Sequence, residues 1–238
     1  MRKLRPSVAL GAVLLSLCTS SVQAQEHLEP LEAGAPALAD YHQMLRRVFH
    51  AIYEGNVAVS AIVTPSFSPE TAIAIKKDGS DYQVVTLTPR EHLWRYALVD
   101  LMQDGTVRRL DEHTAEDEEE ELREIRSGLP ERPEDVDLTR CHRPISSSTA
   151  VSLIAAWDAM LADVRPFDQD ESYIVMDGTS YEYQSRSGGV SRSGAIYAPI
   201  QGRAEQLTVL THELIEFCNR RTGQSRLVRL ARSITGTT

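Results

Sequence analysis

The segment THELIEFC, residues 211–218, contains the residue types that begin a zinc-protease helix. In the motif H-E-x-x-H, two histidines four residues apart bind the metal and the glutamate acts as a base. Here His212 and Glu213 are present, but Glu216 stands where the second histidine should be. At 100° per residue, His212 and Glu216 lie opposite the apolar stripe of the predicted helix. We therefore expect both side chains to face water, with Glu216 pairing with Arg220, and we expect no metal site.

Other motifs that carry chemistry are absent from the sequence. It contains no G-x-S-x-G nucleophile elbow and no glycine loop that cradles phosphate. Residues 168–173, DQDESY, resemble the start of an EF-hand but have Tyr173 where the loop requires glycine. We expect no cofactor, and no catalytic residue can be named. The sequence thus favours a non-enzymatic protein over an enzyme with a dispersed active site.

The amino terminus has the features of a cleaved secretory signal. Three basic residues precede an apolar stretch, residues 8–17, that is too short to span a bilayer, and small residues end at Ala24. We place the mature start near Gln25 and the signal peptide at residues 1–24. Leu17 precedes Cys18 where a lipobox requires a small residue, which argues against a lipid anchor. The prediction is a periplasmic or secreted protein without membrane insertion after cleavage.

The charge balance restricts the classes of partner. The chain has a net charge of −9, and loss of the three basic residues of the signal lowers it to −12. Such a protein repels nucleic-acid phosphates and anionic lipid headgroups. We therefore expect no nucleic-acid partner and consider a basic or cationic protein the best candidate.

Two cysteines remain after signal cleavage, Cys141 and Cys218. In an oxidising compartment a lone pair is most simply one disulfide. Closing a loop of this length is worth on the order of 4 kcal/mol in the chain-entropy model. We predict this disulfide, with Cys218 on the inward side of the last helix.

The hydrophobic patterns predict a single α+β domain over residues 25–238, an antiparallel sheet of hairpins packed by three main helices. Asp-Gly pairs at 78–79 and 177–178 indicate hairpin turns, because Asp-Gly suits a type I′ turn. The predicted helices are 37–55, 145–167 and 203–222, with a further short helix at 91–102. The predicted strands are 56–63, 71–77, 81–87, 136–142, the two arms of the 172–185 hairpin, and 195–199, with residues 186–194 as a loop. Within the first strand, Val57, Val59, Ala61 and Val63 alternate, so we expect them to share one face of the sheet.

One segment differs in composition from the rest of the chain. Residues 111–137 are dominated by Glu and Asp and contain little to bury. We interpret them as a flexible acidic insertion rather than a second domain. Their functional interpretation is an arm that docks on a basic partner.

Four tyrosines, Tyr173, Tyr181, Tyr183 and Tyr197, concentrate in the predicted last hairpin and strand. Tyrosine on a sheet face is suited to recognition, because it offers a large contact area at low entropy cost. The leading hypothesis is an exported interaction protein, such as an inhibitor or immunity-type binder of another protein. The alternatives are a periplasmic hydrolase with a dispersed site and a structural component of the cell envelope.

Overall fold

A computed structural model describes residues 26–31, 36–93, 130, 132–166, 178–187, 189–199 and 201–236. The described chain forms one six-stranded antiparallel sheet with the strand order β4-β3-β2-β1-β5-β6. The strands are β1 Val57–Pro65, β2 Thr71–Asp78, β3 Asp81–Pro89, β4 Leu138–Ile145, β5 Thr179–Ser187 and β6 Val190–Tyr197. The predicted α+β class with an antiparallel sheet is confirmed.

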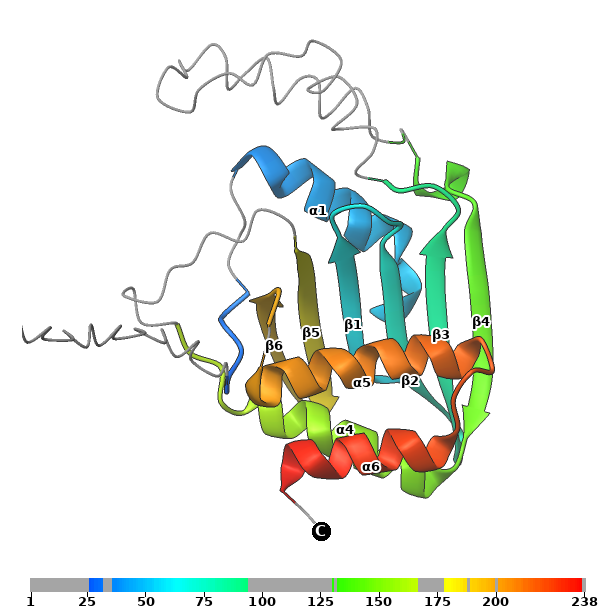
Figure 1. Cartoon of the computed structure of the whole chain (residues 1–238). Coiled ribbons are helices and arrows are strands. Elements are labelled where there is room, and N and C mark those ends of the chain that lie inside the picture. The colour runs from blue at the N-terminus through cyan, green and yellow to red at the C-terminus, as the bar shows by residue number, and fades with distance from the viewer. Residues whose placement is uncertain are drawn as a thin grey trace, which may run out of the picture.

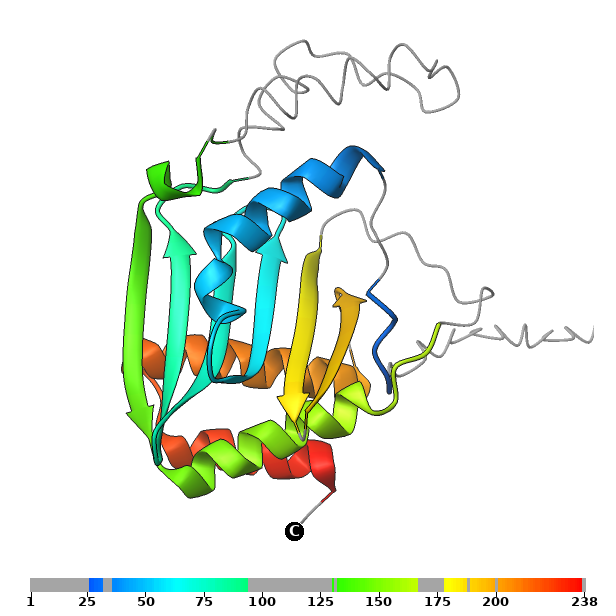
Figure 2. The same cartoon turned by 180° about the vertical axis from the view of Figure 1, so that it is seen from behind.

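Helices cover both faces of the sheet, so the domain has three layers. One face carries α4 Ser147–Leu161, α5 Gly202–Cys218 and α6 Gln224–Thr235, which lie in front of the strands or below them in Figure 1. The other face carries α1 Pro36–Val48 and the short 3₁₀ helix η1 His50–Ile52, which Figure 2 shows from behind. A second short 3₁₀ helix, η3 Pro133–Asp135, directly precedes β4.

The layers enclose two separate hydrophobic clusters. The cluster under α4, α5 and α6 contains the largest buried side chain, Trp157, whose ring meets Tyr183 edge-to-face with centroids 5.9 Å apart. The indole Nε1 of Trp157 donates a hydrogen bond to the carbonyl of Ser60 at 3.3 Å, which satisfies its only polar atom. The second cluster lies between α1, η1 and strands β1, β2 and β3.

The predicted face of the first strand is right for three residues and wrong for one. Val59, Ala61 and Val63 face the three-helix side, as the alternation predicts. Val57 instead belongs to the α1 cluster, because the β1–β2 register shifts between Val57 and Val59. An irregularity of this kind reverses the alternation of side chains, since each residue of a strand points opposite to its neighbours.

One predicted hairpin is confirmed and the turn of the other is wrong. β2 and β3 pair directly around Gly79, which has φ +60°. In the last hairpin, Ser187 pairs with Val190, so the chain reverses between these two residues rather than at the predicted Asp177-Gly178. The predicted loop 186–194 therefore consists largely of paired strand. Gly178 has a packing role instead, because an added Cβ would lie 2.7 Å from Cζ of Tyr197.

The helix predicted at 203–222 ends at Cys218. After a break the chain forms a further helix, α6, which the sequence interpretation missed. In α5 the predicted stripe is correct, with Leu207, Leu210, Leu214 and Phe217 all buried. α6 buries only Leu227, Ala231 and Ile234 and points arginines outward. The domain therefore has four α-helices in its described part, not three.

Several predictions fall on residues outside the described ranges. These are the signal peptide, the helix 91–102 beyond residue 93, Tyr173, and the acidic insertion before residue 130. Within the described part of the chain, no helix combines the length and the apolarity needed to cross a bilayer.

Candidate functional site

The structure confirms the pairing of Cys141 with Cys218. The Cα atoms of the two cysteines are 6.0 Å apart, with disulfide geometry between the side chains. Cys141 lies in β4, an edge strand of the sheet, and Cys218 is the last residue of α5. The bond therefore fixes the end of α5 beside the edge of the sheet. Cys218 is partly buried against the core, as predicted.

Cationic side chains gather around this disulfide. An open depression of about 680 Å³ follows β4 from Arg140 to Pro144 and is closed on the other side by the residues around Cys218. Arg140, His142, Arg143 and Arg220 line it, and no acidic residue does. Arg140, His142 and Arg220 form no ion pair with another described residue. A concave surface with this lining attracts anions.

Among these basic side chains, Arg143 has the most contacts that hold it in place. Its guanidinium lies over the ring of Phe217, 3.9 Å from the centroid, and donates a hydrogen bond to the Phe217 carbonyl. The carbonyls at the end of a helix carry partial negative charge, so a cation there stabilises the helix end. Arg143 thus joins β4 to α5 next to the disulfide and supports the depression.

Arg220 occupies a position where glycine is usual. It follows the C-cap Asn219 and has φ +62°, in the left-handed region. Its N–H donates to the Phe217 carbonyl at 3.0 Å, and the N–H of Arg221 donates to the Glu216 carbonyl at 2.9 Å. These two bonds form a Schellman motif, in which the left-handed residue is most often glycine. An arginine there carries a conformational cost of about 1–2 kcal/mol.

A second depression lies on the α1 face of the same strand. It measures about 490 Å³ and is lined by Arg47, His50, Glu134, Leu138 and Arg140 among others. Arg140 thus borders both depressions. The edge of β4 has a hollow, predominantly basic surface on each of its two faces.

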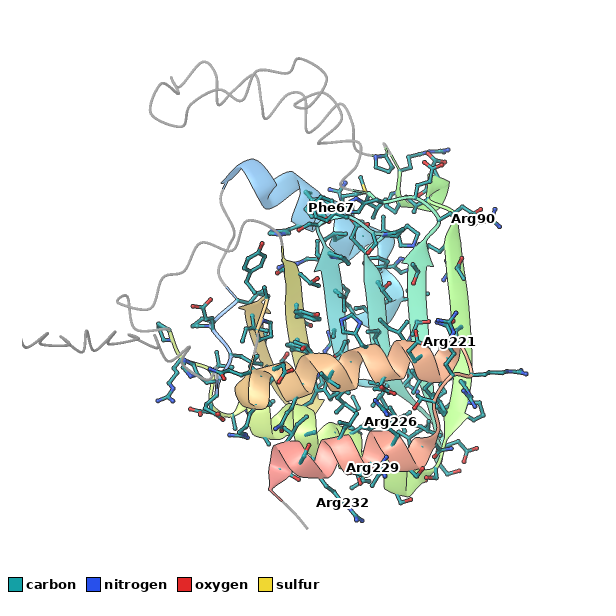
Figure 3. All side chains as sticks on the ribbon, in the orientation of Figure 1. Phe67, Arg90, Arg221, Arg226, Arg229 and Arg232 are labelled. Carbon is teal, nitrogen blue, oxygen red and sulfur yellow. A yellow bond between two sulfur atoms is a disulfide. The ribbon has the colours of Figure 1, made fainter. Side chains whose placement is uncertain are left out.

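The basic character continues along α6. Residues 219–238 contain five arginines and no acidic residue, although the whole chain has a net charge of −9. Figure 3 shows Arg226, Arg229 and Arg232 along α6, at the end of the molecule opposite Phe67, and Arg221 at the end of α5 near β4. Arg226 pairs with Glu213 at 2.6 Å and Arg221 pairs with Glu216 at 3.4 Å. The predicted pair between Glu216 and Arg220 is therefore wrong.

Two of the four tyrosines of the predicted binding surface are buried in the structure. Tyr181 is 6% exposed and Tyr183 is fully buried, both under the three helices, and burial raises the pKa of each phenol. Tyr197 is 43% exposed and pairs with Ser180, which places it on the opposite face of the sheet from Tyr181. Tyr183 and Tyr181 are core residues whose rings lie parallel, 6.2 Å apart.

His212 is exposed, as predicted, but one edge of its ring also contacts a core tyrosine. Its Nε2 lies 2.8 Å from the hydroxyl of Tyr181, and the two rings meet edge-to-face. Burial lowers the pKa of His212, while the nearby Glu216 acts in the opposite direction. The neutral ring and the Tyr181 hydroxyl thus share one hydrogen bond, whose donor is set by the ring nitrogen that carries the proton. Within the described ranges, no three His, Cys, Asp or Glu side chains lie close enough together to hold a metal ion.

A fully buried carboxyl, Glu70, forms a cluster that the sequence interpretation missed. Tyr41 donates its hydroxyl proton to Oε1 of Glu70 at 2.6 Å, and the N–H of Leu93 donates to Oε2 at 2.9 Å. Nε2 of His92 lies 3.5 Å from Oε1. Burial, followed by the proximity of Glu70, raises the pKa of Tyr41. The cluster ties α1 to the start of β2 and to the chain leaving β3.

The sequence contained a signal for the basic site. Arg140, His142 and Arg143 surround Cys141, and Arg220 and Arg221 follow Cys218 closely. Once the disulfide is assumed, these residues must lie together. For Glu70 no comparable signal exists, because an isolated glutamate before a strand does not indicate burial.

Comparison with protein-family models, with curated proteins and with solved structures found no match to this chain.

Proposed function

We propose that this is an exported, non-enzymatic interaction protein that binds an anionic segment of another protein at the edge of β4. The observation that carries the proposal is the depression beside the disulfide, lined by Arg140, His142, Arg143 and Arg220 with no acidic residue. Charges at such a surface steer a partner and select it by complementarity. Export is supported by the signal-like amino terminus and by the disulfide.

The conformational strain of the left-handed backbone at Arg220 also supports a role in binding. A glycine would relieve the left-handed strain, yet the position holds a cation directed at the edge of the sheet. Strained residues that the surrounding structure holds in place cluster at functional sites. The expected basic partner of the acidic insertion stays a prediction, because that segment lies outside the described residues; the described site fits an acidic partner.

An enzymatic alternative would centre on Tyr181 and His212. The nitrogen that a histidine base would offer to a substrate, Nε2, is already bonded to the Tyr181 hydroxyl at 2.8 Å. That contact explains the pair as a link between β5 and α5. We therefore favour binding over catalysis.

Affinity capture with charge variants tests the proposal. The mature chain, tagged at its C-terminus, is compared with the variant Arg140→Gln/Arg220→Gln and with the matched control Arg229→Gln/Arg232→Gln, which loses the same charge on α6. We expect wild type and control to retain one stoichiometric protein from an envelope extract at low salt, and the site variant to lose it. Equal capture by the site variant, or capture lost only in the control, would refute the proposed site.

A further inference from the structure

The two edges of the sheet differ in how they are covered. At β6, residues 26–31 run alongside, and Glu29 exchanges both backbone hydrogen bonds with Ala195, at 2.9 and 2.8 Å. At β4, no described segment pairs with the outer edge, as Figure 1 shows for the strand at the right of the sheet. An uncovered edge offers unpaired N–H and C=O groups to another chain.

The phase of the β3–β4 ladder identifies the backbone groups that point outward. The N–H of Arg90 donates to the carbonyl of Asp137 at 3.0 Å, so Asp137 directs its backbone toward β3. In an antiparallel pair the inward residues alternate, which puts Arg140, His142 and Pro144 in the outward phase. Pro144 fits this assignment, because proline within a sheet occupies edge positions whose missing N–H would face solvent. Arg140 and His142 therefore point their N–H and C=O groups away from the sheet.

We propose that an acidic, extended segment of the partner adds to this edge as a further strand, paired with the backbone of Arg140 and His142. The inference rests on the proposed function and specifies how the partner binds. In strand addition, backbone hydrogen bonds supply affinity and pockets for alternate side chains supply specificity. β4 has both components, because a depression lies on each face of the sheet beside its edge.

Charge selects the occupant. Side chains of an added strand alternate between the two faces. On the α1 face they meet Arg140, His142 and the exposed Arg47, together with one carboxylate, Glu134; on the helix face they meet Arg143 and Arg220. A second copy of β4 would gather the arginines of both strands along one edge, and like charges on neighbouring strands are unfavourable. The same charges that prevent self-pairing therefore favour an acidic strand.

Peptides with blocked backbones test the inference. The probe is a capped peptide of the same eight-residue length as β4, Thr-Glu-Glu-Val-Thr-Glu-Glu-Val, which places glutamates on both faces. Two further versions carry N-methyl groups on the odd or on the even amides, and a fourth replaces Glu by Gln. An added strand turns only one set of amides toward β4. We therefore expect one methylated version to lose about tenfold in affinity and the other to bind like the parent.

Hydrogen exchange in the complex gives a second readout with an internal control. The amides of Arg140 and His142 should become protected on peptide binding, while those of Cys141 and Arg143, already bonded to β3, should change little. Protection of the Arg140 and His142 amides in the free protein would assign the edge to another segment or a second copy and overturn the inference.

The outcomes separate this inference from the proposed function. If both methylated peptides bind like the parent, charge alone holds the ligand; strand addition is then wrong and the proposed function stands. If no peptide binds at low salt, strand addition by acidic segments is wrong, and the capture experiment still decides the proposed function on its own.

Discussion

Replacing Arg220 by glycine should make the protein more stable and its binding weaker. Arg220 is the left-handed residue of the Schellman motif that ends α5, with φ +62°. Relief of the left-handed conformation is worth about 1–2 kcal/mol. The greater freedom of glycine in the unfolded chain removes about 0.5–1 kcal/mol of that gain. The expected net effect is a stabilisation of about 0.5–1 kcal/mol, or a rise in Tm of about 1–4 °C for a domain of this size.

Urea unfolding and calorimetry measure this effect, with Arg220→Ala as the matched control. Alanine removes the same charge but keeps a Cβ, so it should leave stability near the wild-type value. Both variants should bind an acidic ligand more weakly, because both remove a cation from the depression. The reasoning fails if glycine is no more stable than alanine, since the backbone at position 220 would then carry no strain. It fails in its functional part if glycine binds as well as arginine.

Three other changes have expected outcomes. Glu70→Ala removes the carboxylate that accepts from the Tyr41 hydroxyl and from the Leu93 N–H, and it should cost about 3 kcal/mol of stability in urea unfolding. Tyr41→Phe removes only one of these bonds and should cost about 1 kcal/mol. Equal costs would mean that Glu70 acts only through Tyr41. Because burial lowers the pKa of His212 below its usual 6.5, the folded state takes up a proton less readily than the unfolded chain. The stability that the neutral His212 ring contributes is therefore complete above about pH 6.5 and declines as pH falls through the folded pKa. His212→Gln should flatten that part of the curve of unfolding free energy against pH. An unchanged curve would contradict the lowered pKa of His212. Reduction of the Cys141–Cys218 disulfide opens a link of sequence separation 77 and should remove about 4 kcal/mol, seen as a lower urea midpoint with reductant, while the double serine variant should be insensitive to reductant.

Local signals predicted the fold class well. The Asp78-Gly79 turn joins neighbouring strands, so its effect on structure depends on a few adjacent residues. The stripe of α5 was equally readable, because each of its four apolar residues meets the core directly. The disulfide followed from cysteine number and compartment alone, without any knowledge of the fold.

The errors arose where distant contacts decide. Gly178 follows an aspartate and resembles a hairpin turn, but it is a glycine because the Tyr197 ring packs against it. Packing against a distant ring depends on the tertiary structure rather than on local preference. α6 is a different case: Leu227, Ala231 and Ile234 stand at i, i+4 and i+7, so the helical spacing was present in the sequence and was overlooked.

The candidate site is a mixed case. Its cations adjoin the two cysteines in sequence, so the disulfide prediction could have located them. What the sequence could not supply is that Arg140 and His142 lie on a sheet edge with which no described segment pairs, and that Arg220 has a left-handed backbone. Edge position depends on the order of all six strands, and a single strand does not reveal it.

Arg90 and Asp137 join the ends of β3 and β4 as the closing pair of a hairpin does. The N–H of Arg90 bonds to the Asp137 carbonyl at 3.0 Å and their side chains pair at 3.0 Å, so the ladder continues one residue pair beyond the strand ends. The 46 residues between them leave and return at one point of the sheet. The entropy of closing such a loop changes only with the logarithm of its length, by about 0.6 kcal/mol for each doubling. β3 and β4 can therefore pair as a hairpin does despite the long connection. The two ends of that connection belong to the fold, because the N–H of Leu93 bonds to Glu70 and Val136 packs against the α1 cluster, so any exchanged connection must keep both.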